Sequence, residues 1–321
     1  MKRISIKDFS NIKIGNAENV SAGTGCTVII SESGMCAGLD VRGGGPASRE
    51  SELLKPLAQA DAIHAVVLGG GSAFGLDAAG GVMQFLEERG IGFDVGVTKV
   101  PLVCQSDIFD LSVADSTVRP DKAMGYEACK NAYADNYQDG NYGAGVGATV
   151  GKLMGMDYCM KSGIGSYAVQ VGELQLGAVV VVNSLGDIYD YQNGKIIAGM
   201  LAQDHKTFAG TEDVMFRSIE VHDNKFVGNT TIGAIITNGA FNKSQLCKIA
   251  GMAHNGYARS IRPVHTTADG DSIYALSVGK VEADLDMAGT LAAKVMSEAI
   301  SQAVKSAKKA YGYPAYEDIM I

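Results

Sequence analysis

A β-branched and apolar run, Thr230-Thr231-Ile232-Gly233-Ala234-Ile235-Ile236, directly follows the polar pair Gly228-Asn229. Such a run is typical of a buried strand, and a Gly-Asn pair favours a turn immediately before it. A chain of 321 residues, 46% of them hydrophobic, can bury one large core or two ordinary ones around this strand. Two threonine hydroxyls are therefore expected at the first positions of a buried strand.

The threonine pair has two interpretations. In the ordinary one, Asn229-Thr230-Thr231 is a polar strand entry without chemistry. In the other, the Asn229–Thr230 peptide bond breaks and Thr230 becomes an N-terminal nucleophile. A threonine hydroxyl is a weak nucleophile, and a neighbouring free α-amine can take its proton. The local sequence alone favours the ordinary interpretation.

The order of predicted elements favours an α+β layered protein over a doubly wound sheet, because hairpins and amphipathic helices are mixed without a βαβ period. Strands are predicted at 26–30, with 36–41 as its hairpin partner, at 62–68 and at 177–182. Helices are predicted at 76–88, at 244–258 with Ser244 as its cap, and in a long C-terminal helix whose buried face carries Met287, Leu291, Val295, Ala299, Ala303 and Val304.

Charge and cysteine usage exclude several classes of function. The net charge of −8, without a basic stripe, argues against a nucleic-acid partner. The six cysteines are scattered without a CxxC pair, so no zinc-type site is expected. The first residues are too polar for a signal peptide, and no apolar run has membrane-spanning length. We expect a soluble, cytoplasmic protein with no membrane partner.

Two glycine-rich stretches, 69–75 and 143–151, fail the common binding motifs. The first follows a predicted strand and could bind an anion on backbone N–H groups, but it lacks the dinucleotide spacing. Ser72 also fails the nucleophile-elbow pattern, because Phe74 stands where the second glycine belongs. The second stretch fails the phosphate-loop pattern, because Leu153 replaces the required hydroxyl residue. Locally, the glycines indicate packing positions or a pocket wall, and Lys152 is interpreted as a solvated loop lysine.

Other polar groups also have two interpretations. Asn183 ends a predicted buried strand, where its amide could close a turn or point at a bound carbonyl. Asp269 and Asp271 flank Gly270, as in many ordinary turns; alternatively, one carboxylate orients the Thr230 machinery and the other supports it. Residues 190–227 are mostly polar, so we expect an exposed segment that would let a new chain end at Thr230 move.

Several motifs occur together in one family and in the same order. They are Leu68-Gly-Gly-Gly-Ser-Ala-Phe-Gly-Leu-Asp-Ala-Ala79, Gly145-Val-Gly-Ala-Thr-Val-Gly-Lys-Leu153, Asn183-Ser-Leu-Gly-Asp187, Asn229-Thr-Thr-Ile-Gly233 and Asp269-Gly-Asp271. From about residue 12 to residue 307 the chain resembles the DmpA-type self-processing aminopeptidases. That family includes D-aminopeptidase/esterases, β-aminopeptidases and nylon-oligomer hydrolases, and its members are N-terminal-nucleophile-like hydrolases.

The resemblance implies a four-layer αββα sandwich of the DmpA and ornithine acetyltransferase type, formed by a single domain over 1–321. It also implies that the chain cuts itself between Asn229 and Thr230. The products would be an α fragment, 1–229, and a β fragment, 230–321, which stay together. Thr230 would then be the nucleophile.

By the same resemblance, Asn183 matches the amide assigned to the oxyanion hole, which stabilises the developing negative charge. Asp269 and Asp271 match an acidic pair that assists or orients the threonine, and Lys152 matches a lysine near the nucleophile. Phe109 stands where the family has a tyrosine near the oxyanion, and a phenyl ring cannot donate a hydrogen bond. Another donor replaces it, or the substrate preference differs.

The expected function is hydrolysis of small peptides or amides with a free amino end, through an acyl-enzyme on Thr230, without metal or organic cofactor. The resemblance also implies a homo-oligomer, a tetramer of α/β units. Two alternatives stay open: an acyltransferase like ornithine acetyltransferase, and a non-catalytic ligand-binding protein with the same fold. The intact Asn229-Thr230 pair and the two aspartates argue against the second alternative.

Overall fold

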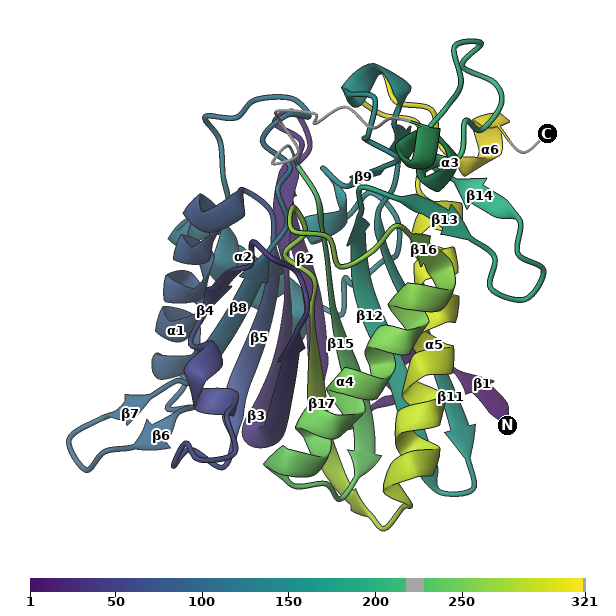
Figure 1. The fold of residues 1–321 in the computed structure, drawn as a ribbon. Coiled ribbons are helices and arrows are strands. Elements are labelled where there is room, and N and C mark those ends of the chain that lie inside the picture. Colours follow the sequence, from purple (N-terminus) through teal and green to yellow (C-terminus); the bar gives the residue numbers. More distant parts are fainter. Residues whose placement is uncertain (218–227, 320–321) are drawn as a thin grey trace.

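The computed structural model describes residues 1–217 and 228–319, and its centre is a ten-stranded sheet (Figure 1). Two pairs of neighbours are parallel, β15 with β17 and β5 with β8, and the other pairs are antiparallel. In spatial order the strands are β1 (Lys2–Ile4), β11 (Ile164–Val171), β12 (Leu174–Asn183), β15 (Thr230–Gly239), β17 (Ser272–Val281), β3 (Thr24–Val41), β5 (Ile63–Gly69), β8 (Val103–Asp107) and β4 (Ala47–Arg49), with β2 (Lys13–Asn19) also paired to β3.

Strand β3 connects two halves of this sheet. Its residues 24–30 pair with β2 and β5, whereas its residues 36–41 pair with β17. The predicted hairpin between 26–30 and 36–41 is therefore wrong, because the chain continues as one strand of 18 residues. Gly34, at φ +80°, lies where the pairing with β5 shifts register, between Ile30 and Met35. The irregularity bends the strand and does not reverse it.

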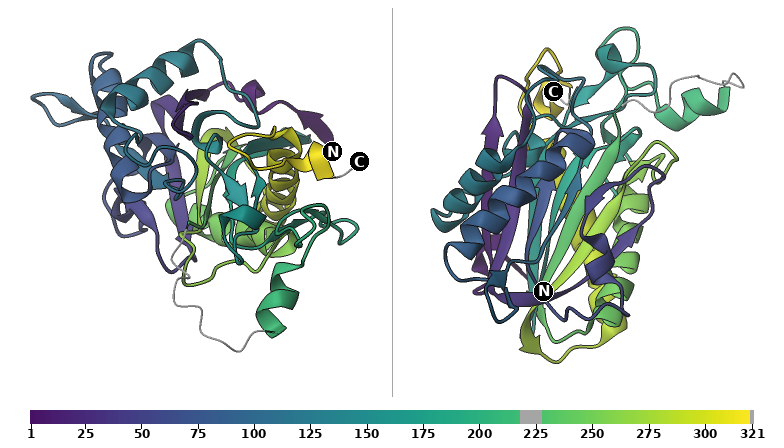
Figure 2. Two further views of the ribbon diagram at one scale, coloured as in Figure 1. Left: turned by 90° about the horizontal axis from the view of Figure 1, so that it is seen from above. Right: turned by 90° about the vertical axis from the view of Figure 1, so that its left-hand side faces the viewer.

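Four layers result, two helical and two of sheet, as Figure 2 shows from the side. Helices α4 and α5 cover the half formed by β1, β11, β12, β15, β17 and the end of β3, and helices α1 and α2 cover the half that contains β2, β5 and β8. Three separate clusters of buried side chains fill the three spaces between the layers. The predicted α+β class and four-layer sandwich are confirmed.

The helices show why the layers form. The cap of α4 is Asn242, whose side chain accepts from the Gln245 N–H at 3.0 Å, so the predicted Ser244 cap is wrong. Helix α5 buries the predicted stripe except Met287, which is 39% exposed. The α-helices are α1 (Ala78–Glu87), α2 (Lys122–Tyr133), α3 (Thr211–Arg217), α4 (Lys243–Ser260), α5 (Leu285–Ser306) and α6 (Tyr316–Ile319), and the 3-10 helices are Ile6–Asp8, Ser51–Leu54, Ser72–Asp77, Gly143–Gly145 and Met156–Tyr158.

Two glycines explain how closely helices approach the sheet. A Cβ on Gly38 would collide with the backbone of Cys247 in α4, and one on Gly165 would collide with the backbone of Ala303 in α5. The sheet surface is open at both positions because glycine has no side chain. Part of the high glycine content therefore serves layer packing.

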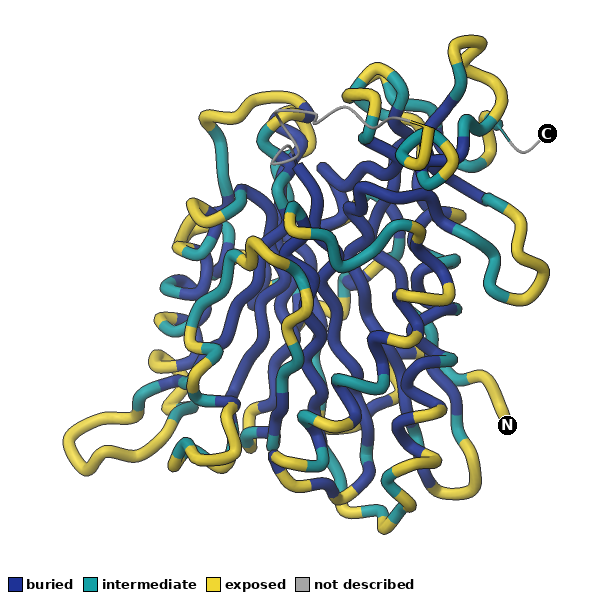
Figure 3. The backbone as a smooth tube through the Cα atoms, viewed as in Figure 1, coloured by how far each residue is buried: buried dark blue, intermediate teal, exposed yellow. Residues whose placement is uncertain are grey.

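Short strands and loops complete the fold. Three small sheets pair β9 (Thr149–Val150) with β10 (Met160–Lys161), β6 (Phe93–Asp94) with β7 (Lys99–Val100), and β13 (Asp187–Tyr189) with β14 (Ile196–Ala198) and β16 (Ile261–Arg262). The β6–β7 hairpin is exposed, whereas the long strands are buried (Figure 3).

The segment predicted to be exposed, 190–227, is described as far as residue 217. Within it Ile197, Ala198 and Met200 are buried, so that part of the prediction is wrong, and 218–227 lie outside the described residues. Within 1–217 and 228–319, none of the helices has the length and apolar character needed to cross a membrane.

Candidate active site

Thr230 and Asn183 meet at one end of the two-sheet core. They are directly opposite each other in the antiparallel pair formed by β15 and β12. Side chains alternate between faces along a strand, and Ile232, Ala234, Val179 and Val181 all belong to the core between the sheets. Thr230 and Asn183 therefore face the same space between the sheets, and only 4% of Thr230 is exposed.

The two aspartates come to Thr230 through the parallel pairing of β15 with β17. Ile232 is opposite Ser272, so the residues that precede β17 lie beside the start of β15. The Gly270 N–H donates to Thr230 Oγ1 at 3.0 Å, and the Thr231 N–H donates to Asp271 Oδ1 at 2.7 Å. Asp269-Gly270-Asp271 follows a turn closed by the Asp269 N–H on the Thr266 carbonyl, and it lies beside Thr230.

Each carboxylate is oriented by a residue from the preceding loop. Thr266 donates to Asp269 Oδ2 from its backbone N–H at 2.7 Å and from its hydroxyl at 2.6 Å. His265 contacts Asp271 Oδ2 with its backbone N–H at 3.1 Å and its ring Nδ1 at 2.8 Å. Burial, and secondly the charge of Asp271, raise the pKa of Asp269 to about 6. The described residues include no hydrogen bond between Asp269 and Thr230, so Asp271 is the aspartate in contact with β15.

Lys152 is buried, which contradicts its local interpretation as a solvated loop lysine. Its side chain reaches Asn183, donating from Nζ to Oδ1 at 2.8 Å and to the backbone oxygen at 3.1 Å, and it also donates to the Gly228 carbonyl. Burial lowers the pKa of Lys152 to about 7, although nearby acidic groups partly oppose that shift. A lysine in this state can donate a hydrogen bond and exchange a proton near neutral pH.

The Asn183 amide is fixed by contacts at both of its ends. Oδ1 accepts from the Thr149 N–H at 3.0 Å and from Lys152. Nδ2 donates to the carbonyl oxygens of Gly228 and Phe109, both at 3.1 Å. In the continuous chain, the two donors Asn183 and Lys152 thus meet at the Gly228 carbonyl, one residue before the bond expected to break.

A cavity of about 240 Å³ adjoins this group. Its wall includes the predicted residues Asn229, Thr230 and Phe109, together with residues from the first glycine-rich stretch and from β8. The lining residues are Gly45, Ala47, Ser72, Asp107, Phe109, Gly228, Asn229, Thr230 and Ala268. Ser72, at φ +54°, is held in the left-handed region that favours glycine. From the first glycine-rich stretch, Ser72 lines the cavity, whereas Gly70 and Gly75 are packing positions, because a Cβ there would collide with Asp110 and with the Gly70 backbone.

Phe109 lies on this wall as the alignment predicts, but its ring offers no donor. A Cβ on Gly228 would lie 3.4 Å from the Phe109 ring, so the ring is next to the Gly228 backbone. The hydrogen bonds to the Gly228 carbonyl come from Asn183 and Lys152.

Asp107 is a cavity residue that sequence reasoning missed. It is 2% exposed, and its Oδ1 accepts from Gln105 Nε2 at 2.7 Å. Its Oδ2 is buried and has no hydrogen-bond partner among the described residues. Burial raises the pKa of Asp107 well above its usual range. The available signal was its position two residues before Phe109. His265 and Thr266, also missed, lie a few residues before the predicted aspartates.

Comparison with known proteins places the chain among hydrolases. Residues 5–316 match the profile of "Peptidase family S58". An uncharacterized aminopeptidase of Mycobacterium leprae is 36% identical over 97% of this chain and 93% of its own length. A 6-aminohexanoate-oligomer endohydrolase of Kocuria sp. is 31% identical over 93% of this chain and 85% of its own length.

A solved structure supports the architecture. The L-aminopeptidase D-Ala-esterase/amidase of Ochrobactrum anthropi, described as a variant of the Ntn hydrolase fold, superposes with a TM-score of 0.71 at 17% identity. The match covers 94% of this chain and 86% of that one. At this identity the likeness concerns the fold.

Proposed function

The chain belongs to peptidase family S58 and is a hydrolase of peptide or amide bonds, and from this premise we propose that it is a self-cleaving N-terminal-threonine hydrolase of small peptides and amides. The observation that carries the proposal is the position of Thr230. Its hydroxyl begins a buried strand on a cavity wall, opposite the Asn183 amide and beside the Asp271 carboxylate. A nucleophile in such a site is oriented before substrate arrives.

In the proposed self-cleavage, Thr230 Oγ attacks the Asn229 carbonyl carbon and the Thr230 nitrogen leaves. The hydroxyl proton passes to that nitrogen, so an ester between Asn229 and Thr230 Oγ forms as the amide bond breaks. Water then hydrolyses the ester, which yields a carboxylate on Asn229 and a free α-amine on Thr230. The products are the fragments 1–229 and 230–321.

In the proposed hydrolysis, the new α-amine of Thr230 takes the proton of its own hydroxyl, which attacks the substrate carbonyl. Asn183 and Lys152 now contact the Gly228 carbonyl. Departure of residues 228–229 from the cavity would free both donors for the oxyanion of the substrate. The leaving amine takes a proton, and water releases the acyl group from Thr230.

The cavity supports a small acyl group with a free amino end. Asp107 belongs to the wall that Thr230 also lines, and its buried Oδ2 has no hydrogen-bond partner among the described residues. A cationic amino group placed there would pair with the ionised carboxylate and lower the raised pKa of Asp107. The cavity of about 240 Å³ has room for little more than one residue beside the nucleophile. The proposal includes a homo-oligomer of α/β units, which light scattering on the processed protein tests.

The test is intact mass of freshly purified protein beside the Thr230→Ala and Thr230→Ser variants. We expect wild type to give two fragments that meet at Asn229/Thr230, Thr230→Ala to stay whole, and Thr230→Ser to cleave, because serine keeps a hydroxyl nucleophile. Processed wild type should then hydrolyse amides that have a free amino end. A whole wild-type chain under all conditions, or a cleaved Thr230→Ala chain, contradicts the proposal.

A further inference from the structure

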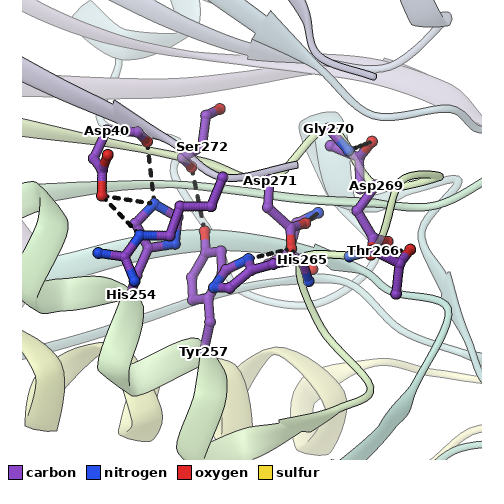
Figure 4. Close-up of polar contacts among 12 residues, drawn as sticks. Asp40, His254, Tyr257, His265, Thr266, Asp269, Gly270, Asp271 and Ser272 are labelled. Atoms are coloured by element: carbon purple, nitrogen blue, oxygen red, sulfur yellow. Dashed lines mark hydrogen bonds and ion pairs between the residues drawn. The ribbon is translucent and has the colours of Figure 1, made fainter. Parts of the chain in front are cut away.

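His265 adopts a backbone conformation that histidine rarely takes. Its φ is +59°, in the left-handed region where glycine, asparagine and aspartate are the common residues. It lies in the loop between β16 and β17, immediately before Thr266 and close to the two aspartates (Figure 4). A strained residue beside a candidate site is a reason to ask what its side chain does there.

The strained backbone lets His265 contact one carboxylate oxygen twice. Its N–H and its ring Nδ1 both meet Asp271 Oδ2, at 3.1 and 2.8 Å. The other oxygen, Oδ1, accepts from the Thr231 N–H at 2.7 Å. The Asp271 carboxylate therefore bridges His265 to the residue that follows the nucleophile.

This bridge lies where the sheet ladder stops. Pairing between β15 and β17 begins at Ile232 and Ser272, so on this side Thr231 donates to a side chain and not to a strand. After cleavage, Thr230 would be a chain terminus, held on this side by the Gly270 N–H at its hydroxyl and by the Thr231 contact. The Asp271 carboxylate thus replaces a backbone partner for the Thr231 N–H, next to the chain end that cleavage would create at Thr230.

Among residues 1–217 and 228–319, His265 Nδ1 has one hydrogen-bond partner, Asp271 Oδ2. A carboxylate only accepts, so Nδ1 carries the proton and donates to Asp271. The ring packs against His254 and Tyr257, with centroid distances of 4.8 and 6.0 Å (Figure 4). His254 Nε2 lies 3.1 Å from the Asp40 carbonyl oxygen, and burial lowers the pKa of His254 to about 4, so His254 is neutral near pH 7. The Asp40 carboxylate behind it is paired with Arg42 at 2.9 Å.

From this geometry we propose that His265 is a positioning residue: it orients Asp271 and, through the Thr231 N–H, fixes the direction of the Thr230 hydroxyl. The inference rests on the proposed function and adds a residue to it. Thr266 is the parallel case for Asp269, since it also uses a backbone N–H and a side-chain donor. Two consecutive residues thus orient two carboxylates, and only the pair formed by His265 and Asp271 reaches the nucleophile strand.

The test compares His265→Asn with His265→Gly. Both residues accept a positive φ, so neither variant is penalised for the backbone. Asparagine offers a side-chain amide donor to Asp271, whereas glycine keeps only the backbone N–H, and both lose the packing of the imidazole ring. We expect the glycine variant to lower kcat on an amide substrate about 30-fold with KM changed less than about threefold, because misorientation affects the reacting geometry. The asparagine variant should recover to within about fivefold of wild type.

The matched control is His205→Gly. His205 also has a positive φ, +52°, but it is exposed and stacks on Tyr158. Its replacement should leave kcat unchanged. Equal activity of wild type and His265→Gly would overturn the inference, and so would an asparagine variant as slow as the glycine variant, because the ring would then act only by packing.

A second measurement separates this inference from the proposed function. In a Thr230→Ala background, which is expected not to cleave, the Thr231 amide proton should exchange with solvent about tenfold faster when His265 is glycine, because the carboxylate that accepts it is no longer oriented. The asparagine variant should restore slow exchange. Unchanged exchange in the glycine variant contradicts the positioning role even if Thr230 proves to be the nucleophile. A wild type that never cleaves contradicts the proposed function alone.

Discussion

Lys152 and Lys161 are alike in sequence and burial, but they lie in surroundings of different kinds. Both are fully buried, and burial lowers the pKa of each to about 7. Lys152 Nζ contacts the Asn183 side chain and the carbonyl of Gly228, next to the bond expected to break. Lys161 Nζ contacts three backbone carbonyls, at 3.0, 2.9 and 2.5 Å. What differs is the set of acceptors: two of those of Lys152 belong to Asn183, and the third is the carbonyl that precedes Asn229.

The two regions are connected through Asn183. The carbonyls that Lys161 contacts include Gly145 and Ala148, which precede Thr149. The Thr149 N–H donates to Asn183 Oδ1, the same oxygen that Lys152 contacts. Lys161 therefore supports the loop that orients the amide, and Lys152 acts on the amide directly. Burying a lysine without hydrogen-bond partners costs free energy. Lys161 has its partners in the backbone of the supporting loop, and Lys152 has its partners in the candidate active site.

Removal of the site lysine is expected to have the largest effect. Lys152→Met should slow cleavage at Asn229/Thr230 by about 100-fold, because the donor that holds the Gly228 carbonyl, one residue before the bond expected to break, is lost. The free energy of unfolding should fall less than in Lys161→Met, since the Gly228 carbonyl and Asn183 Oδ1 keep Asn183 Nδ2 and the Thr149 N–H as donors. A time course of intact mass, with urea unfolding as the control, measures both. Cleavage at the wild-type rate would show that the two lysines do not differ in this way.

Removal of Lys161, the lysine that supports the loop, should affect the free energy of unfolding more than the rate of cleavage. Lys161→Met should lower the free energy of unfolding by about 3 kcal/mol, because three buried carbonyls lose a donor. Cleavage by the folded fraction should slow less than about tenfold. Urea unfolding and the same mass time course provide the numbers. A variant as stable as wild type, or one as slow as Lys152→Met, would remove the distinction.

The pH dependence of the free energy of unfolding is a further test of how the two lysines differ, with a smaller expected effect per pH unit. The pKa of Lys161 falls from 10.5 to about 7 on folding, so between these values the unfolded chain binds more protons. Stability from this group therefore rises as pH increases through that window. Relative to Lys161→Met, wild type should gain on the order of 1 kcal/mol per pH unit between about pH 7 and 10. Urea unfolding of both proteins at several pH values tests this, and parallel curves would contradict it.

The predictions of strands and helices agree best with the structure where the pattern lies within a single segment. The buried apolar runs of β12 and β15, and the long apolar stripe of α5 apart from Met287, are confirmed. The hairpin predicted from 26–41 is wrong, because a bulge within a long strand and a turn between two strands both interrupt an apolar pattern. Local reasoning could not place Lys152 in the core, since its partners lie in β12 and before β15.

By itself the sequence determined the strand that begins at Thr230, the layered α+β class and, through ordered motifs, the set Lys152, Asn183, Asp269 and Asp271. Those signals are local periodicities and short motifs, which each segment carries independently of its neighbours. Only the tertiary structure decided that Asp271 and not Asp269 contacts β15, that Asp107 lines the cavity, and that His265 contacts Asp271. These facts depend on the register between β15 and β17 and on which faces of the two halves of the sheet pack together. A shift of one residue in the register would turn every side chain of a strand to the opposite face.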